Sequence, residues 1–212
     1  PDEAAAAHAD YQAFSTPVPV TGAVNMSECM AHLHDSLPPT AIVTNGAGNF
    51  AAWLHRFYRH RACRTQLAPT SGAMGYGYPA ALAAKSVHPD REVICIAGDG
   101  DYLMTGQELA TAVQYGINAV VVVVDNGTYG TIRMHQEMHY PGGQRTIATD
   151  LKNPDFVKYA EAFGAFGVRC ERTEDFPAAL AAARAAGRPA LVHLITSAED
   201  IAPNRTITGL RS

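Results

Sequence analysis

The feature that most constrains the fold is a pair of apolar runs separated by one helix-length segment. The runs are "EVICIA" at 92–97 and "INAVVVVVD" at 117–125, both rich in β-branched residues. Runs without polar alternation are typical of strands buried on both faces of a parallel sheet. Between them, Thr105 and Glu108 have the spacing of a capping box and predict a helix that extends to about residue 115. A strand–helix–strand unit of this kind connects parallel strands in one sheet.

The same alternation continues on both sides of this unit. We expect helices at 27–37, 49–59, 78–87, 153–164 and 175–186, and strands at 41–44, 167–170 and 190–195. The predicted fold class is α/β, a three-layer sandwich in which a mostly parallel sheet has helices on both faces. We assign 25–198 to this domain, 1–24, rich in Ala and Pro, to a linker from a preceding domain, and 199–212 to an irregular C-terminal tail. An ordinary flexible arm is the alternative for the N-terminal segment.

Composition argues against several classes of partner and location. The formal net charge is -4 and no basic stripe is present, so we expect no binding to nucleic acid. The longest apolar runs have the length of strands, so we expect no membrane span. The four cysteines are far apart and form no C-x-x-C motif, which favours a reducing cytoplasm over a disulfide-dependent fold.

Polar residues and glycines stand where two of the predicted strands end. Asp99 follows the first strand and Asn126 follows the second, so both should lie at the carboxyl edge of the sheet, where α/β proteins bind ligands. Gly98 and Gly100 expose backbone N–H groups to an anion. The Asp99 carboxylate, the Asn126 side-chain oxygen and the backbone carbonyl of Thr128 leave room for phosphate oxygens and water around Mg²⁺. We therefore predict a metal that holds a diphosphate; two ordinary surface turns are the alternative.

These residues carry a resemblance to a known family. The stretch G98-D99-G100, followed by 24 residues and then Asp125-Asn126, is similar to the thiamine diphosphate motif. The segments "GAMGYGYPAA" (72–81), "GQELATAVQYG" (106–116) and "NGTYGTIRMHQE" (126–137) resemble the C-terminal cofactor domain of acetolactate synthase-like enzymes. The resemblance covers roughly residues 40 to 195 and implies the thiamine diphosphate-binding fold. Asp125 is a departure, because the family commonly has Asn there.

The resemblance implies roles for individual residues. Gly72 matches the glycine whose carbonyl holds the aminopyrimidine of the cofactor, and Met74 matches the apolar wedge that bends the cofactor into a V shape. An ordinary core methionine is the alternative for Met74. Asp101 and Gly130 match positions whose backbone N–H groups face the diphosphate.

The loop after the first predicted strand admits two interpretations. In the family, Asn45 and Asn49 lie in the first loop that contacts phosphate, although Asp and His are frequent there. The stretch G46-A47-G48-N49-F50-A51 also satisfies a dinucleotide-binding fingerprint, which would make this an NADP-binding oxidoreductase domain. That fingerprint needs an acidic residue about 20 positions later, and none occurs from 36 to 89.

His135 is the tentative catalytic candidate. The stretch "RMHQE" at 133–137 follows the loop with the predicted metal ligands Asn126 and Thr128, and it should lie near the substrate side of the cofactor. Acetolactate synthases usually carry Trp at this position, and a solvated histidine on a helix surface is the alternative.

The resemblance implies a lyase or transferase that decarboxylates 2-oxo acids, joins them to a second carbonyl compound, or does both. It also implies an N-terminal pyrimidine-binding domain or subunit that supplies a Glu, and a homodimer or tetramer. This chain alone would then be inactive. A non-catalytic interaction module that keeps the cofactor fold is the remaining alternative.

Overall fold

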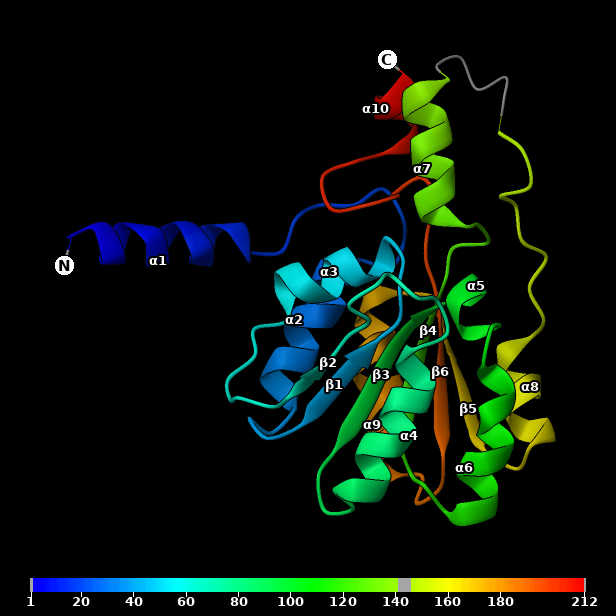
Figure 1. The fold of residues 1–212 in the computed structure, drawn as a ribbon. Helices are drawn as coiled ribbons and strands as arrows, with labels where there is room; N and C mark the ends of the chain where they lie inside the picture. The colour runs from blue at the N-terminus through cyan, green and yellow to red at the C-terminus, as the bar shows by residue number, and fades with distance from the viewer. Residues whose placement is uncertain (1, 141–145, 212) are drawn as a thin grey trace.

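One six-stranded sheet organises the computed structural model, which describes residues 2–140 and 146–211 (Figure 1). The strand order is β2-β1-β3-β4-β6-β5, and every neighbouring pair is parallel. The strands are β1 (Ile42–Asn45), β2 (Gln66–Leu67), β3 (Val93–Gly98), β4 (Val120–Asp125), β5 (Phe166–Cys170) and β6 (Ala190–Ile195). The predicted α/β fold class with a parallel sheet is confirmed.

Helices cover both faces of this sheet. The helices of the described residues are α1 (Asp2–Phe14), α2 (Met26–Ser36), α3 (Phe50–Phe57), α4 (Gly77–Val87), α5 (Asp99–Tyr102), α6 (Leu109–Tyr115), α7 (Gly130–His139), α8 (Phe156–Ala162), α9 (Phe176–Ala185) and α10 (Ile207–Arg211). Side chains from α2, α3 and α9 build one hydrophobic core, and side chains from α4, α5, α6 and α8 build the other. No helix in the described residues has the length and hydropathy to cross a membrane.

Strand β4 shows why the apolar runs have no polar alternation. Val120, Val122 and Val124 pack into the core under α2, α3 and α9, whereas Val121 and Val123 pack into the core on the opposite face. Because successive side chains of a strand point to opposite faces, a strand between two helical layers needs apolar residues at every position.

The carboxyl edge of the sheet is where the chain leaves room for a site. Strand β3 ends at Gly98 and continues directly into α5, and β4 ends at Asp125 and continues through a loop into α7. Figure 1 shows α7 and α10 together beyond this edge, away from the two helical layers.

The predicted capping box at Thr105 is wrong. The Thr105 hydroxyl donates to the carbonyl of Gly75, 2.8 Å away, and no side-chain cap bond forms at this helix start. The predicted helix is instead a 3-10 turn at Gly106–Glu108 followed by α6. Thr105 thus connects this segment to the loop before α4, which lies near the carboxyl edge.

The chain ends are more regular than expected. Helix α1 spans most of the expected linker and buries no residue, and Figure 1 shows it projecting away from the sheet. The Asp200 carboxylate accepts hydrogen bonds from the backbone N–H groups of Thr21 and Gly22, so the two end segments pack against each other. The expected irregular tail contains α10. Whether residues 1–24 join this domain to another stays a prediction.

Candidate functional site

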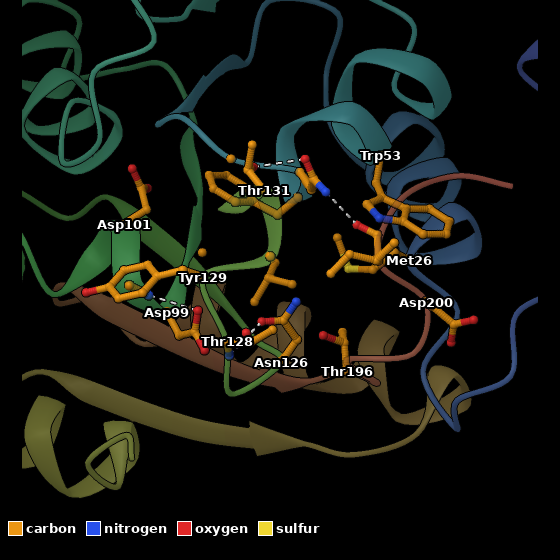
Figure 2. A pocket seen from close by; sticks show the side chains of 18 of the residues that line it. Met26, Trp53, Asp99, Asp101, Asn126, Thr128, Tyr129, Thr131, Thr196 and Asp200 are labelled. Carbon is orange, nitrogen blue, oxygen red and sulfur yellow. Dashed lines mark hydrogen bonds between the residues drawn. The ribbon is translucent and has the colours of Figure 1, made fainter. Parts of the chain in front are cut away.

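A pocket opens at the carboxyl edge of the sheet, between the ends of β3 and β4 and the loop after β1 (Figure 2). The predicted site residues among those that line it are Asn49, Met74, Gly98, Asp99, Gly100, Asp101, Asn126, Thr128 and Gly130. Figure 2 shows Asp99, Thr128 and Asn126 next to one another along one side of the pocket. One strand–helix–strand unit therefore brings the Gly-Asp-Gly stretch and Asn126 together, as the sequence predicts.

Asp99 is the buried carboxylate of this pocket. Only 3% of the residue is exposed, and burial raises the pKa of its carboxyl to about 6. Its Oδ1 accepts from the N–H of Gly100 at 2.8 Å, and its Oδ2 accepts from the N–H of Gly127 at 2.9 Å and from Asn153 Nδ2 at 2.7 Å. The neighbouring Asp125 carboxyl also raises the pKa of Asp99, through its charge and a side-chain hydrogen bond.

The loop 126–128 is held in a fixed conformation beside Asp99. Asn126 Oδ1 accepts from the N–H of Thr128 at 3.1 Å, and Gly127 has a φ of +67°, which favours glycine. The Thr128 hydroxyl donates to the carbonyl of Thr149 at 2.8 Å. An Asn126 oxygen and a backbone carbonyl are hard ligands of the kind that Mg²⁺ takes.

The donor set fits a metal that also binds phosphate. Asp99 is the only His, Cys, Asp or Glu side chain in the predicted ligand set. Residues 2–140 and 146–211 contain no group of three or more such side chains that could hold a metal. A site with one carboxylate, one amide oxygen and one carbonyl leaves octahedral positions for phosphate oxygens and water, which is how proteins commonly bind Mg²⁺.

The two glycines beside Asp99 are required by close packing. A Cβ on Gly98 would lie 2.7 Å from the Phe50 ring, and a Cβ on Gly100 would overlap the Tyr129 ring. The prediction had these glycines bring the backbone close to a ligand and expose N–H groups to an anion, but the N–H of Gly100 donates to Asp99 Oδ1. The structure adds that no other residue fits at either position without moving an aromatic side chain.

Asp101 has a structural role that the sequence prediction missed. Its carboxylate accepts from the N–H of Gly75 at 2.8 Å and from the N–H of Ala47 at 3.2 Å. Burial raises the pKa of this carboxyl to about 6. Asp101 thus joins α5 to the loop after β1 and to the loop before α4, three segments around the pocket.

Three predicted residues lie outside the pocket lining. Asn45, predicted in the first loop that contacts phosphate, is buried, and its Oδ1 lies 3.1 Å from His55 Nε2; its contact with a cofactor stays a prediction. Gly72 lies on an exposed loop with a φ of +67°. His135 is exposed on α7, and its ring stacks on His139 with centroids 6.0 Å apart.

Asn153 is a site residue that sequence reasoning placed in a helix. Helix α8 begins three residues later, because the Asp155 side chain accepts from the N–H groups of Val157 and Lys158 and so caps it. Asn153 is left in the preceding loop, where its amide reaches Asp99. The Asn-Pro pair at 153–154 could have indicated that Asn153 precedes the helix, because the helical conformation is unfavourable for a residue before proline.

The rest of the pocket combines an apolar wall with polar side chains such as Thr131, Thr196 and Asp200. Met26 and Trp53 line the side away from Asp101, and Val20 and Val24 from the N-terminal segment complete it. No sequence pattern indicated this part, because its residues come from separate elements.

Comparisons with known proteins agree with this geometry. Residues 46–194 match the family model described as "Thiamine pyrophosphate enzyme, C-terminal TPP binding domain". The chain is 40% identical over 168 residues to an acetolactate synthase of Mycobacterium avium, and 38% identical over 176 residues to an acetolactate synthase large subunit of Parasynechococcus marenigrum. These alignments cover 76% and 82% of this chain but only 27% and 28% of the relatives.

A solved structure shares the fold. It is the thiamine diphosphate-dependent 4-hydroxybenzoylformate decarboxylase of Rhodococcus jostii, with a TM-score of 0.79 and 30% sequence identity; the match covers 87% of this chain and 34% of the other. None of these matches supports the dinucleotide-binding alternative. The chain belongs to the thiamine pyrophosphate enzymes and contains their C-terminal cofactor-binding domain.

Proposed function

We propose that the pocket binds the diphosphate of thiamine diphosphate through Mg²⁺, with Asp99, Asn126 and the Thr128 carbonyl as the protein ligands. The observation that carries this proposal is the buried Asp99 carboxylate in the pocket lining beside Asn126, at the adjoining ends of β3 and β4. The family match supports the choice of cofactor.

The remaining pocket residues would position the cofactor. The backbone N–H groups of Asp101 and of Gly130, at the start of α7, would face the diphosphate, and Asn49 lies at the entrance to α3. Gly72 and Met74, the latter 37% exposed, would contact the pyrimidine end. When bound, the thiazolium ring accepts the electron pair released as the bond between the carboxyl and carbonyl carbons of a 2-oxo acid breaks.

The substrate class is a 2-oxo acid, and the reaction is decarboxylation, carboligation or both. This part of the proposal rests on the names of the relatives, which include acetolactate synthases and a 4-hydroxybenzoylformate decarboxylase. The chain spans 27% to 28% of the length of the acetolactate synthases. We therefore also propose an N-terminal pyrimidine-binding domain or subunit that supplies a Glu. We further propose assembly as a homodimer or tetramer and a cytoplasmic location.

Replacement of Asp99 tests the metal site. Asp99→Ala removes the only charged ligand, so Mg²⁺-dependent binding of thiamine diphosphate to the complete protein should weaken at least about tenfold, or about 1.4 kcal/mol. Isothermal calorimetry with and without Mg²⁺ measures this. The matched control is Asp90→Ala, at an exposed position. Unchanged Mg²⁺-dependent affinity in Asp99→Ala would refute the assignment.

Replacement of His135 tests its place near the substrate. If the complete protein covers the exposed face of α7 with the substrate pocket, His135→Trp should change product ratios from a panel of 2-oxo acids and leave cofactor affinity nearly intact. His139→Trp, one helical turn away on the same helix, is the control. Identical product ratios in the wild type and His135→Trp would make His135 an ordinary surface residue.

A further inference from the structure

Two carboxylates share the same hydrogen-bond donors behind the proposed metal site. Asn153 Nδ2 donates to Asp99 Oδ2 and to Asp125 Oδ1, at 2.7 Å in each case. The N–H of Gly127 also faces both oxygens, at 2.9 Å and 3.0 Å. These oxygens therefore lie close together and share the amide and the backbone N–H. Two like charges in such an arrangement repel each other unless they are bridged by donors.

His193 completes the arrangement from β6. Its Nε2 lies 2.8 Å from Asp125 Oδ2, and the imidazole is buried. A carboxylate only accepts hydrogen bonds, so Nε2 carries the proton. The His193 ring packs edge-on against Phe156 at the start of α8, with centroids 5.0 Å apart, which fixes its orientation.

The loop that carries Asn153 is aligned with the metal loop by its backbone. The N–H of Leu151 donates to the carbonyl of Gly127 and the N–H of Tyr129 donates to the carbonyl of Thr149, each at 2.8 Å. Asn153 is thus placed two residues beyond this pairing, beside Asp99. Neither oxygen of Asp125 faces the pocket lining, because one contacts Asn153 and Gly127 and the other contacts His193.

We propose that Asn153, Asp125 and His193 are positioning residues that hold the Asp99 carboxylate, through Asp125 and the Gly127 N–H, in the orientation that binds the metal. The inference rests on the proposed function, because it needs Asp99 to be a ligand. It explains the departure at Asp125, where the resembling family commonly has Asn: the charged residue here has its own buried donor in His193 and its own bridge in Asn153.

Of the three positioning residues, Asn153 should change the metal affinity most when it is replaced. Without its amide, Asp99 Oδ2 and Asp125 Oδ1 retain one shared N–H between two negative charges, and Asp99 keeps only its bonds from the N–H groups of Gly100 and Gly127. Second-layer partners of metal ligands typically change metal affinity by about 10- to 100-fold when replaced. Asn153 is in a loop and only half-buried, so its replacement should leave the fold intact.

The test is a Mn²⁺ titration of the complete protein in the presence of thiamine diphosphate, with free Mn²⁺ measured by electron paramagnetic resonance. Asn153→Leu should weaken Mn²⁺ binding by about 10- to 100-fold, and Asn153→Ala repeats the loss with a smaller side chain. Asn118→Leu is the matched control, because its amide donates to Gly187 on the exposed surface. Mn²⁺ affinity in both Asn153 variants within twofold of the control would overturn the proposal.

A second variant distinguishes bridging from packing. Adding Asp125→Asn to Asn153→Leu removes one of the two repelling charges, so the double variant should bind Mn²⁺ more tightly than Asn153→Leu alone. A residue that only packs gives no such recovery, and its absence would contradict the bridging role. His193, which contacts the other oxygen of Asp125, can be tested in the same way. His193→Gln keeps an N–H donor and should bind Mn²⁺ more tightly than His193→Leu.

Asp99→Asn separates this inference from the proposed function. If Asp99→Asn abolishes Mn²⁺ binding while the Asn153 variants do not weaken it, the metal site stands and the positioning role is wrong. If Asp99→Asn binds as the wild type does, the metal site itself is wrong.

Discussion

At the scale of single residues, Asp99 and Asp101 lie two positions apart in the same short helix and have different partners. Asp99 contacts the metal loop and Asn153, whereas Asp101 contacts the loop after β1 and the loop before α4. The Gly-Asp-Gly stretch made Asp99 predictable, since its spacing to Asn126 matches one strand–helix–strand unit. The side-chain role of Asp101 was not predictable, because its partners are backbone N–H groups 26 and 54 positions away.

The first prediction concerns Asp101 and Gly46. A Cβ on Gly46 would overlap the Asp101 carboxylate, so Gly46→Ala should push that group away from its two N–H donors. We expect a loss of about 1–3 kcal/mol in the free energy of unfolding, the cost of leaving buried donors unpaired. Asp101→Ala should cost a similar amount, and urea unfolding of both single variants and the double variant measures the coupling.

The double variant decides whether the two effects have one cause. Because Gly46→Ala acts through Asp101, it should cost much less in the Asp101→Ala background, which is strong non-additivity. Fully additive losses would show that Gly46 is required for another reason.

At the scale of elements, Glu137 joins α7 to α10. Its side chain is fully buried and bonds Arg133 on the same helix and Arg211 on α10, at 2.7–2.8 Å. The hydrogen bond from Arg211 is the main reason that the pKa of Glu137 is held at about 2. This contact holds the last helix against α7, the helix that follows the loop with the proposed metal ligands.

The second prediction follows from Glu137. Its pKa is lower in the folded chain than its ordinary value of 4.5, so its stabilisation is present above about pH 4.5 and is lost as the pH falls from 4.5 towards 2. Glu137→Gln should lower the free energy of unfolding at pH 7 by about 1.5–3 kcal/mol. It should also flatten the pH dependence in that window, measured by urea unfolding. An unchanged slope below pH 4.5 would show that Glu137 does not supply it.

Sequence patterns predicted the long helices and strands of the domain, but they missed the short strand β2 and the N-terminal helix α1. Strands β3, β4 and β6 are apolar at nearly every position, and that pattern has one physical explanation, burial between two layers. Strand β2 has two exposed residues and pairs only through its backbone with β1, so its side chains carry no signal. Helix α1 buries no residue, so no apolar stripe marked it.

At the scale of the whole molecule, the proposed ligands for the diphosphate come together from the ends of β3 and β4 and the start of α7. Gly72 and Met74, the residues proposed for the pyrimidine end, are exposed. Parallel strands place their carboxyl ends at one edge, so sequence alone predicts which side holds the ligand. The apolar pocket wall of Met26, Trp53 and Val20 depends on how separate elements pack, which local patterns do not encode.

The third prediction concerns residues 1–212 as an isolated chain. Within the described residues, no Glu lines the pocket, so we expect the chain alone to lack a base for the cofactor carbon. We expect weak, Mg²⁺-dependent binding of thiamine diphosphate and no detectable decarboxylation of pyruvate or benzoylformate. Carbon dioxide release measures the second point. Sustained turnover by the isolated chain would show that it carries its own activating acid.

The central claim is that Asp99, Asn126 and the Thr128 carbonyl bind the metal that holds the diphosphate. The most direct measurement is anomalous X-ray scattering from crystals of the complete protein grown with thiamine diphosphate and Mn²⁺. We predict one strong manganese peak within coordination distance of a carboxylate oxygen of Asp99, of Asn126 Oδ1 and of the Thr128 carbonyl oxygen. Bound thiamine diphosphate with no manganese peak at these three oxygens, or with the peak on other residues, would contradict the account.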